Sequence, residues 1–577
     1  MYSRYCCEFS PFLAHNDRSE KYPSPRRANS GSAIGVTLDE KPSTPSSPSR
    51  STPMPGEEPT AGCSTASYFG PPCTPVYLLS CVLSVAVNFG MRASFCIVFA
   101  LIIHTKAPFA QFAGIGIDLQ TATAFISILI CSVLSKVGVS ISGPDIIAAI
   151  VFSSMASIIG AENKSNPDAA LATLLVAQLI STAVVGVAWL LLVRYRWTRI
   201  LTYVPVSVIM GFLGCIGYKV VKESFKQATG DWWYYPETWE FWMLLLPTLA
   251  FGTSLFMLKK FHVFHPVVLL PFFLVVPVAM FYVVSRGALG YSMAELRDRG
   301  WFYPQLNYST IFYTEYKVLR PGLVDGAALV KCLPEMLVLL LFATMECLIW
   351  LKTTGTELGL EIDMEYEVKL ASAQTLLSLA VLGVPAYSQA KSNLLNYSII
   401  GNTTERRVGI ATALLCGMLW FADFPVVEVI PRFFLGGLLL YVAIPLLENN
   451  LLAAYFHLTK KEFVAVWIIF LTNAIAGQYS KHSLVFALLA GVAIAFVIFA
   501  LQSGNINIIR AEMTGRDYQS MVLRSYDEMH LLDRIGHRFV IVELQHFIFF
   551  GSATQLLDLA KDVVRSQDPD NMANHIR

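Results

Sequence analysis

Apolar runs follow one another from residue 76 to residue 502, and this pattern constrains the fold more than any other feature of the sequence. A helix that crosses a bilayer needs about 20 predominantly apolar residues. The composition is 55% hydrophobic and 14% charged, and the mean hydropathy is +0.54. The sequence therefore predicts an all-α polytopic membrane protein. We read fourteen segments, at about residues 76–104, 109–137, 142–160, 168–194, 198–222, 239–258, 263–284, 327–351, 368–385, 388–401, 407–423, 430–449, 461–477 and 482–502.

The two ends of the chain differ from this middle part. Residues 1–75 are rich in proline and serine and lack a periodic apolar pattern, so they predict a disordered cytoplasmic segment. After residue 503 the apolar spans stop, and a β-rich run at 538–553 precedes an amphipathic stretch. We therefore expect a transmembrane domain at 76–503 and a cytosolic domain at 504–577.

Composition and motifs argue against several classes of protein. The net charge is +1 and no basic block is interleaved with aromatic residues, so we expect no nucleic-acid partner. The 11 cysteines form no CxxC pair and no metal-ligand spacing, which argues against a zinc site or a disulfide framework. The sequence also contains no P-loop and no Ser-His-Asp arrangement. We therefore expect neither an enzyme nor a bound cofactor.

Basic residues in short loops predict the orientation of the segments, because such residues accumulate on the cytoplasmic side. With fourteen segments, all four clusters fall on one side, and that side also holds both termini. Both termini are therefore expected to be cytoplasmic, and the sequons at Asn163 and Asn307 face the other side. The clusters are Arg194, Arg196 and Arg199; Lys259 and Lys260; Arg406 and Arg407; and Lys460 and Lys461.

The long loop at 285–326 divides the segments into seven plus seven. A repeat with an odd number of segments must be inverted relative to its copy, so we expect inverted repeats at about 76–284 and 327–502. The third segment of each repeat is short. A pair of short, Gly/Pro-interrupted segments at corresponding repeat positions points to a transporter's binding site.

These two short segments open with Ser-Ile-Ser-Gly-Pro-Asp at 140–145 and with Val-Pro-Ala-Tyr-Ser-Gln-Ala-Lys-Ser-Asn-Leu-Leu-Asn at 384–396. Two half-helices would meet there with their N-termini, each carrying unsatisfied N–H donors and a partial positive charge. This arrangement favours an anionic substrate. The alternative for 142–145 is an ordinary helix start, and we expect Asp145 to support the helix end rather than to bind substrate.

Ionisable residues at membrane depth are the next signal, because each costs at least about 2.5 to 3.5 kcal/mol unless it meets a partner or water. Glu346 lies within an apolar run and suits proton coupling, with Lys391 as a possible partner. A carboxyl group bonded to a backbone carbonyl is the alternative. Lys391 either adds positive charge to the second half-helix or extends toward an interface. Arg92 either attracts substrate or forms a structural pair.

Several stretches resemble the SulP family of sulfate permeases and related anion transporters. The last of them resembles the opening of a STAS domain, and its Phe-Phe-Gly-Ser pattern is most similar to the fungal and protist branch. The stretches are Leu358–Gln374, Pro385–Asn396, Tyr203–Phe212, Ile430–Leu439 and Arg538–Ala553.

The resemblance implies a uracil-permease-like fold, in which a core domain moves against a gate domain and an anion binds between helices three and ten. It implies Glu346 as the coupling acid. It also implies an α/β STAS domain, which residues 504–577 are too few to complete. The candidate substrate-binding residues are Phe89, Ser142, Gly143, Tyr387, Ser388, Gln389, Lys391 and Ser392.

The sequence departs from the family pattern at two places. The usual Pro-Gln pair of helix one is absent around residues 86–88, and Gln389 or Lys391 replaces the Arg of the Ser-Arg-Ser pattern in helix ten. Sulfate itself is therefore less firmly implied than anion transport.

The function that we expect is secondary active transport of a small inorganic anion such as sulfate, bicarbonate or chloride. Proton symport or anion exchange with alternating access would drive it. A nucleobase carrier of the same fold and a non-transporting scaffold are the alternatives, and Glu346 near a broken helix argues against the scaffold. The expected partners are the anion, protons, the lipid bilayer and a second copy in a homodimer. The expected location is the plasma membrane or a vacuolar or other endomembrane.

Overall fold

The computed structural model describes residues 75–105, 108–198, 204–230, 238–261, 266–304, 319–422, 426–504, 509–518, 520–536, 539–545, 553 and 556–562. The expected disorder of the N-terminal segment lies outside these residues, apart from Pro75, where the first helix begins. The sequon at Asn307 also lies outside them.

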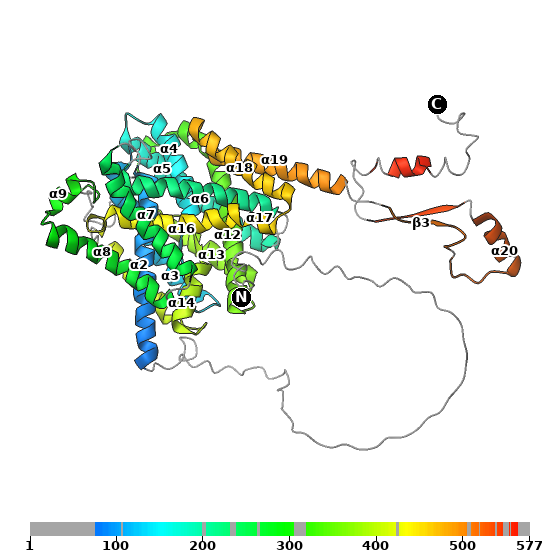
Figure 1. The fold of residues 1–577 in the computed structure, drawn as a ribbon, viewed down its shortest axis with the longest axis horizontal. Coiled ribbons are helices and arrows are strands. Elements are labelled where there is room, and N and C mark those ends of the chain that lie inside the picture. Colours follow the sequence, from blue (N-terminus) through cyan, green and yellow to red (C-terminus); the bar gives the residue numbers. More distant parts are fainter. Residues whose placement is uncertain are drawn as a thin grey trace, which may run out of the picture.

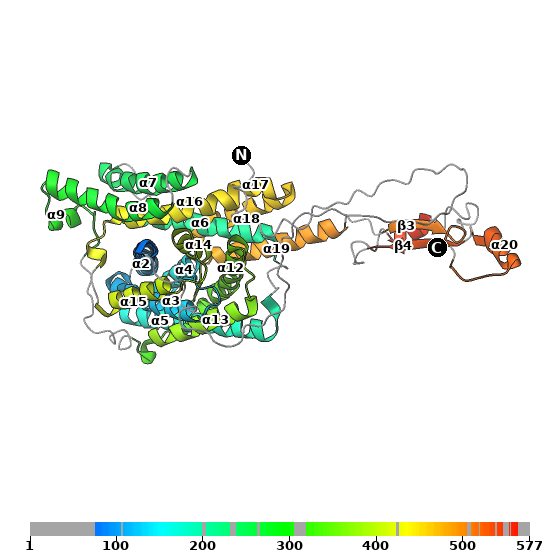
Figure 2. The ribbon, with the colours of Figure 1, turned by 90° about the horizontal axis from the view of Figure 1, so that it is seen from below.

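The membrane helices pack in two groups, and Figure 2 shows α7, α8 and α16 of one group above α3, α5 and α15 of the other. The group that begins first in the chain is called the core group. It consists of α2 (Pro75–His104), α3 (Ala113–Leu134), β1 (Ser142–Pro144), α4 (Ile146–Glu162), α5 (Pro167–Arg194), α12 (Leu333–Leu358), α13 (Met364–Ser378), β2 (Ala386–Ser388), α14 (Ala390–Ile400) and α15 (Arg407–Ala422).

We call the other the gate group. It consists of α6 (Val206–Thr229), α7 (Trp239–Lys260), α8 (Pro266–Tyr282), α16 (Arg432–Leu447), α17 (Ala454–His457), α18 (Lys460–Tyr479) and α19 (Ser483–Gly504). Short elements connect these helices. They are η2 (Ala110–Phe112), η4 (Val283–Ala288), α9 (Met293–Asp298), η5 (Pro321–Leu323), α11 (Gly326–Lys331), η6 (Leu379–Val381), η7 (Val426–Glu428) and η8 (Glu448–Leu452).

Nine helices of the described residues are long and apolar enough to cross a membrane, and α4 and α15 are shorter apolar helices. The prediction of a helical, multi-pass membrane protein is therefore confirmed. The count of fourteen segments and the inverted repeat stay predictions.

Small residues let the helices of the gate group approach one another closely. A Cβ on Gly252 of α7 would lie 2.8 Å from the carbonyl oxygen of Gly437 in α16. On the other side of α16, the hydroxyl of Ser224 donates to the carbonyl of Gly436 at 2.7 Å. Close backbone approach of this kind is typical of helix pairs in membranes, where packing and interhelical hydrogen bonds hold helices together.

Helix α2 passes through the middle of the bundle, and Figure 2 shows it between the two layers. Every residue from Cys96 to His104 is buried. Protein therefore surrounds this stretch on all sides. Arg92 lies four residues before it on the same helix and is also buried, so α2 carries this cation into the interior.

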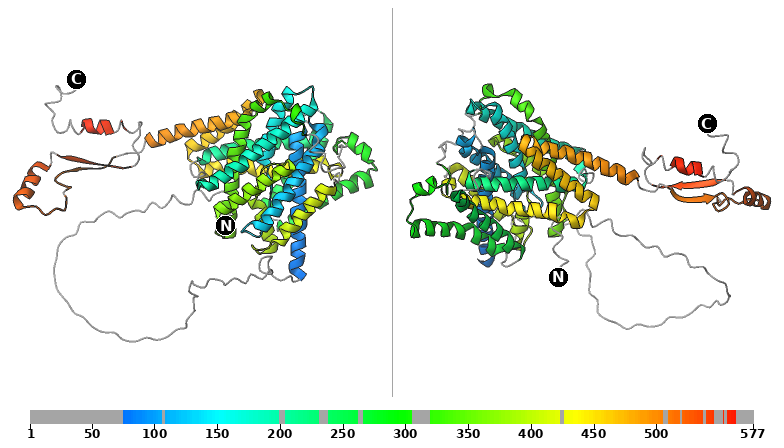
Figure 3. Two further views of the ribbon diagram at one scale, coloured as in Figure 1. Left: turned by 180° about the vertical axis from the view of Figure 1, so that it is seen from behind. Right: turned by 45° about the horizontal axis from the view of Figure 1, so that its top comes forward.

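The C-terminal part contains a strand pair and short helices. Strand β3 (Ile509–Thr514) pairs antiparallel with β4 (Val540–Leu544), and α20 (Tyr526–Ile535) lies between them in the chain. Figures 1 and 3 show that α19 leads from the bundle toward these elements. The STAS-like domain stays a prediction, because much of the run at 538–553 lies outside the described residues.

Candidate functional site

The two short strands β1 and β2 cross in the interior of the core group. They pair antiparallel, and all their residues are buried. Backbone that leaves the helical state at membrane depth needs partners for its polar groups, and here each strand supplies partners for the other. The register places Ser142 opposite Ser388, Gly143 opposite Tyr387 and Pro144 opposite Ala386.

A helix begins directly after each strand, but the two starts differ. At α4, Asp145 is the N-cap and its carboxylate accepts from the backbone N–H of Ile147 at 2.9 Å. At α14, Gln389 is the N-cap and makes no side-chain cap hydrogen bond. Instead its Nε2 donates to the carbonyl of Pro144 at 2.9 Å. The expectation that Asp145 supports a helix end is confirmed.

Arg92 of α2 reaches into this crossing. Its Nη1 donates to Oε1 of Gln389 at 3.0 Å, and its Nη2 donates to Oγ of Ser392 at 2.9 Å. The residue is 5% exposed. A guanidinium has five N–H donors, and these two bonds use two of them. Among the described residues, the ion pairs within 4 Å do not include Arg92.

Gly143 leaves room for the guanidinium of Arg92. A Cβ at this position would lie 2.7 Å from Nη1 of Arg92 and 3.0 Å from its Cζ. Such distances are shorter than real Cβ contacts, and the two hydrogen bonds of Arg92 restrict how far it could move. The missing side chain of Gly143 therefore lets a cation from α2 lie against β1.

A second polar cluster lies around Glu346 of α12. The hydroxyl of Tyr387 donates to Oε2 of Glu346 at 2.7 Å. The carboxyl group of Asp145 lies close enough to interact electrostatically with that of Glu346. Two like charges so close would repel, so a proton on one of the two carboxyl groups would stabilise the pair. The partners of Glu346 are thus side chains, not the backbone carbonyl of the alternative expectation.

Lys391 lies at the second position of α14 and is exposed. Its Nζ lies 5.4 Å from the centroid of the Trp350 ring on α12, within the range of a cation–π interaction. It also interacts favourably, by charge, with Glu346. The positive charge of Lys391 therefore lies near the crossing while its side chain remains accessible.

Asn393 holds the crossing together. The side chain of Asn393 is fully buried. Its Oδ1 accepts a hydrogen bond from the N–H of Ile141 at 2.7 Å. Its Nδ2 donates to Oγ of Ser388 at 2.9 Å and to Oγ1 of Thr354 in α12 at 3.2 Å. One amide thus ties β2 and the residue before β1 to α12. One turn later, Asn396 donates to the carbonyl of Val139 at 3.0 Å.

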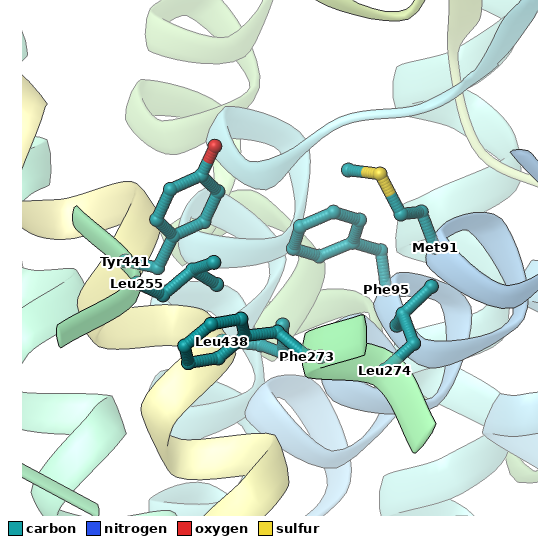
Figure 4. Close-up of a pocket in the computed structure, with 7 residues that line it drawn as sticks. All are labelled: Met91, Phe95, Leu255, Phe273, Leu274, Leu438 and Tyr441. Carbon is teal, nitrogen blue, oxygen red and sulfur yellow. The ribbon is translucent and has the colours of Figure 1, made fainter. Parts of the chain in front are cut away.

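An apolar pocket lies between the core and gate groups. Figure 4 shows Met91 and Phe95 of α2 on one side of it, and Tyr441 and Leu438 of α16 on the other. Its remaining lining residues are Leu255, Phe273 and Leu274. Met91 precedes Arg92 directly, so α2 presents apolar side chains to the gate group and a cation to the crossing.

Comparison with known families identifies the family of this chain. The model of the sulfate permease family matches residues 94–470, which include both half-helices and Glu346. The chain belongs to the sulfate permease family. This family is one of transporters, and the match confirms the resemblance inferred from the sequence.

A yeast transporter is similar in sequence to this sulfate permease family member. The vacuolar basic amino acid transporter VSB1 of Saccharomyces cerevisiae is 22% identical over 427 residues, which are 71% of this chain and 40% of that protein. The chain thus spans less than half the length of this relative.

Solved structures show the same fold. The transmembrane domain of a cyanobacterial bicarbonate transporter, BicA, aligns with a TM-score of 0.50 over 73% of this chain and 98% of that one. Murine SLC26A9, an anion transporter solved in the inward-facing state, aligns with a TM-score of 0.54 over 77% of this chain and 71% of that one. Both are 14% identical to this chain.

The structure brings most of the candidate residues to the crossing, where Ser142, Gly143, Tyr387 and Ser388 lie on the paired strands. Of the others, Phe89 packs on an apolar cluster formed by Ile141 and residues of α2, α3 and α15. The roles of all these residues in substrate binding stay predictions.

Sequence reasoning left Arg92 undecided and did not single out Asn393. The signal for Arg92 was its charge within an apolar run, but the sequence did not indicate its partners. Asn393 could have been noticed as an amide at membrane depth. Among the described residues, no group of three or more His, Cys, Asp or Glu side chains could hold a metal ion.

Proposed function

We propose that this chain is a secondary active transporter whose substrate binds at the β1–β2 crossing, with its anionic group on the guanidinium of Arg92. The observation that carries the proposal is this buried cation, which has neutral hydrogen-bond partners and lies against the start of α14. A buried guanidinium with remaining N–H donors suits a carboxylate or an oxyanion.

The start of α14 supports the same site. Its first N–H groups have no side-chain cap, and a helix N-terminus attracts negative charge. Arg92 thereby supplies, from α2, the positive charge that helix ten of this chain lacks at Gln389. Small inorganic anions such as sulfate, bicarbonate and chloride are the first substrate class to test.

Coupling to protons follows from the carboxyl pair. In this proposal Glu346 and Asp145 share one proton next to the crossing, which relieves the repulsion between their carboxyl groups. Tyr387 donates a hydrogen bond to Glu346. Loss of that proton would add a negative charge beside Arg92 and oppose binding of an anion. Proton symport with alternating access is therefore the favoured mechanism, and anion exchange remains its alternative.

A basic amino acid is a second candidate substrate. The yeast relative is named a vacuolar basic amino acid transporter, and the crossing carries groups for both ends of such a molecule. Its α-carboxylate would bind Arg92, and its cationic group would approach the Asp145–Glu346 pair after the shared proton has left. The same relative suggests an endomembrane, and a homodimer is the expected assembly.

Uptake into proteoliposomes tests both candidates. We would compare radiolabelled sulfate, bicarbonate, chloride, lysine, arginine and uracil, with and without a pH gradient. Uptake of an inorganic anion supports the first candidate, and uptake of lysine or arginine supports the second. Uptake of uracil alone would favour the nucleobase carrier, and uptake of none would favour the scaffold.

Glu346→Gln tests the coupling role. We expect this variant to lose the dependence of uptake on the pH gradient while it keeps substrate binding. Glu357→Gln is the matched control, because it makes the same change at an exposed position of the same helix. If both variants kept the pH dependence of the wild type, the coupling role of Glu346 would be wrong.

A further inference from the structure

We propose that Glu335 and His482 form a pH-sensitive latch between the core and gate groups. The latch lies at the end of the bundle where α4 ends and α12 begins. We call this the outer end, because the basic clusters of the sequence predict that it faces away from the cytosol. The inference rests on the proposed function in one respect, since it assumes that the two groups move relative to each other during transport.

The latch itself is a close contact between two titratable groups. Nδ1 of His482, in the connection between α18 and α19, lies 2.5 Å from Oε1 of Glu335, near the start of α12. The Glu335 side chain is 1% exposed, and that of His482 is 35% exposed. Oε2 of Glu335 is buried and has no hydrogen-bond partner among the described residues. The carboxylate therefore depends on His482 for its hydrogen bond.

Two further contacts join the same groups at the same end. Nζ of Lys481 donates to the carbonyl of Ser157 at 2.8 Å, and Nζ of Lys219 on α6 donates to Oγ of Ser154 at 3.4 Å. Ser154 and Ser157 lie three residues apart on α4 and therefore share a face of that helix. The gate group thus meets α4 and α12 together, and opening the outer end would break all three contacts.

The charges around the latch come from every neighbouring element. Lys219 of α6 interacts favourably with Glu335, and Cys332 lies one turn before it. Beside Lys481, α4 ends at Glu162 and the following loop carries Lys164. Burial, with a contribution from Lys164, lowers the pKa of Lys481, and Glu162 opposes that shift.

The dependence on pH follows from the charge of the imidazole. Histidine is the side chain whose charge changes most readily between pH 5 and 8. When the pair holds its proton, His482 and Glu335 form a charge-assisted hydrogen bond; when the proton leaves, a buried carboxylate faces a neutral ring. The latch is therefore stronger at low pH. An acidic compartment on this side would keep the outer end closed.

A distance measurement across the outer end tests the latch without requiring transport. Spin labels would be attached to non-natural amino acids at Val330 and Tyr479, which are 64% and 89% exposed on the core and gate sides. This avoids the native cysteines. We would record distance distributions of the full chain in nanodiscs from pH 5.5 to pH 8.

We expect the fraction with the longer distance to rise about fivefold across this range in the wild type, which is the scale of the difference between a charge-assisted and a neutral hydrogen bond. Glu335→Gln and His482→Gln should show the longer distance at every pH, with little change between pH values. The double exchange Glu335→His with His482→Glu should restore the dependence on pH.

Asp168→Asn is the matched control. It removes an exposed acidic side chain from the first turn of α5, a helix of the core group that begins at the same end of the bundle. This variant should behave like the wild type. The latch would be refuted if the wild-type distances did not change with pH, or if Asp168→Asn changed them as much as Glu335→Gln. Either result would leave the proposed substrate site untouched.

Discussion

The helices α4 and α14 begin at the same crossing, yet their N-termini present different chemistry. α4 has 17 residues and is capped by its own acidic residue, Asp145. α14 has 11 residues, has no side-chain cap, and presents Gln389 and Ser392 to the guanidinium of Arg92. Two helix starts at corresponding positions of the predicted repeat therefore carry groups of opposite charge.

This difference divides the crossing into a cationic and an acidic part. An anion that approached Asp145 would meet a carboxylate, whereas one that approached α14 would meet a helix N-terminus and a buried cation. The proton that we propose Asp145 and Glu346 share would reduce the negative charge of the acidic part. We therefore expect the anionic group of the substrate to bind at α14 and proton coupling to take place at α4.

Among variants that test this difference between the two helix starts, Arg92→Gln should have the largest effect on substrate binding. The variant removes the charge and leaves Gln389 and Ser392 without their donor. Charge-assisted hydrogen bonds contribute about 2 to 3 kcal/mol, so substrate binding should weaken roughly 30- to 150-fold. Binding to purified protein measures this loss. Arg194→Gln, at the exposed end of α5, is the control and should bind normally. Unchanged binding in Arg92→Gln would show that α14 is not the anionic end.

Gly143→Ala should have the next largest effect, because its Cβ would displace the guanidinium from β1. Forcing extra atoms into a packed site costs about 1 to 3 kcal/mol. We expect about tenfold weaker binding together with a lower melting temperature. If Gly143→Ala bound substrate like the wild type, the position of Arg92 against β1 would not matter for recognition.

Two variants of Asp145 separate its role as an N-cap from the role of its charge. Asp145→Asn keeps an N-cap oxygen but removes the carboxyl that we propose shares a proton with Glu346, so it should fold normally and lose pH-dependent uptake. Asp145→Ala should in addition lose about 1 kcal/mol of stability, as is usual for a removed N-cap. Thermal unfolding and uptake at two pH values measure the two effects. Equal melting temperatures for the two variants would contradict the capping role.

Replacing the N-cap of a helix at the surface should have the smallest effect. Asp363 caps α13 through the N–H of Tyr366 and pairs with Lys136 at 2.7 Å, where both side chains are about half exposed. Lys136 and this N–H hold the pKa of Asp363 below its ordinary value. Because a lowered folded-state pKa adds stability above the unfolded pKa, the benefit is present at neutral pH and disappears as the pH falls through the folded pKa.

Asp363→Asn should therefore lower the melting temperature slightly at pH 7 and not at all in acid. Exposed ion pairs contribute little, because solvent and salt screen them. A large decrease in melting temperature at pH 7, or a decrease that became larger in acid, would show that the N-cap of α13 matters as much as the helix starts at the crossing.

Local patterns indicated some structural features near the crossing. An ordinary helix start was the alternative interpretation of the Ser-Gly-Pro-Asp run, and a helix does begin there with Asp145 as its N-cap. Glu346 stood out because an acid within an apolar run needs a partner, and Tyr387 donates a hydrogen bond to it. The sequence did not name Tyr387 or the nearby Asp145, because one lies on β2 and the other at the start of α4.

The sequence by itself determined that this chain is a helical membrane protein with two interrupted segments, because hydropathy and helix-breaking residues are local properties. Only the tertiary structure decided which residues meet at the interruption. Arg92 is 297 residues from Gln389 in the chain and donates to it, because α2 passes through the middle of the bundle and Gly143 leaves room for the guanidinium. Packing, which no local pattern encodes, placed the cation at α14 and the acids at α4.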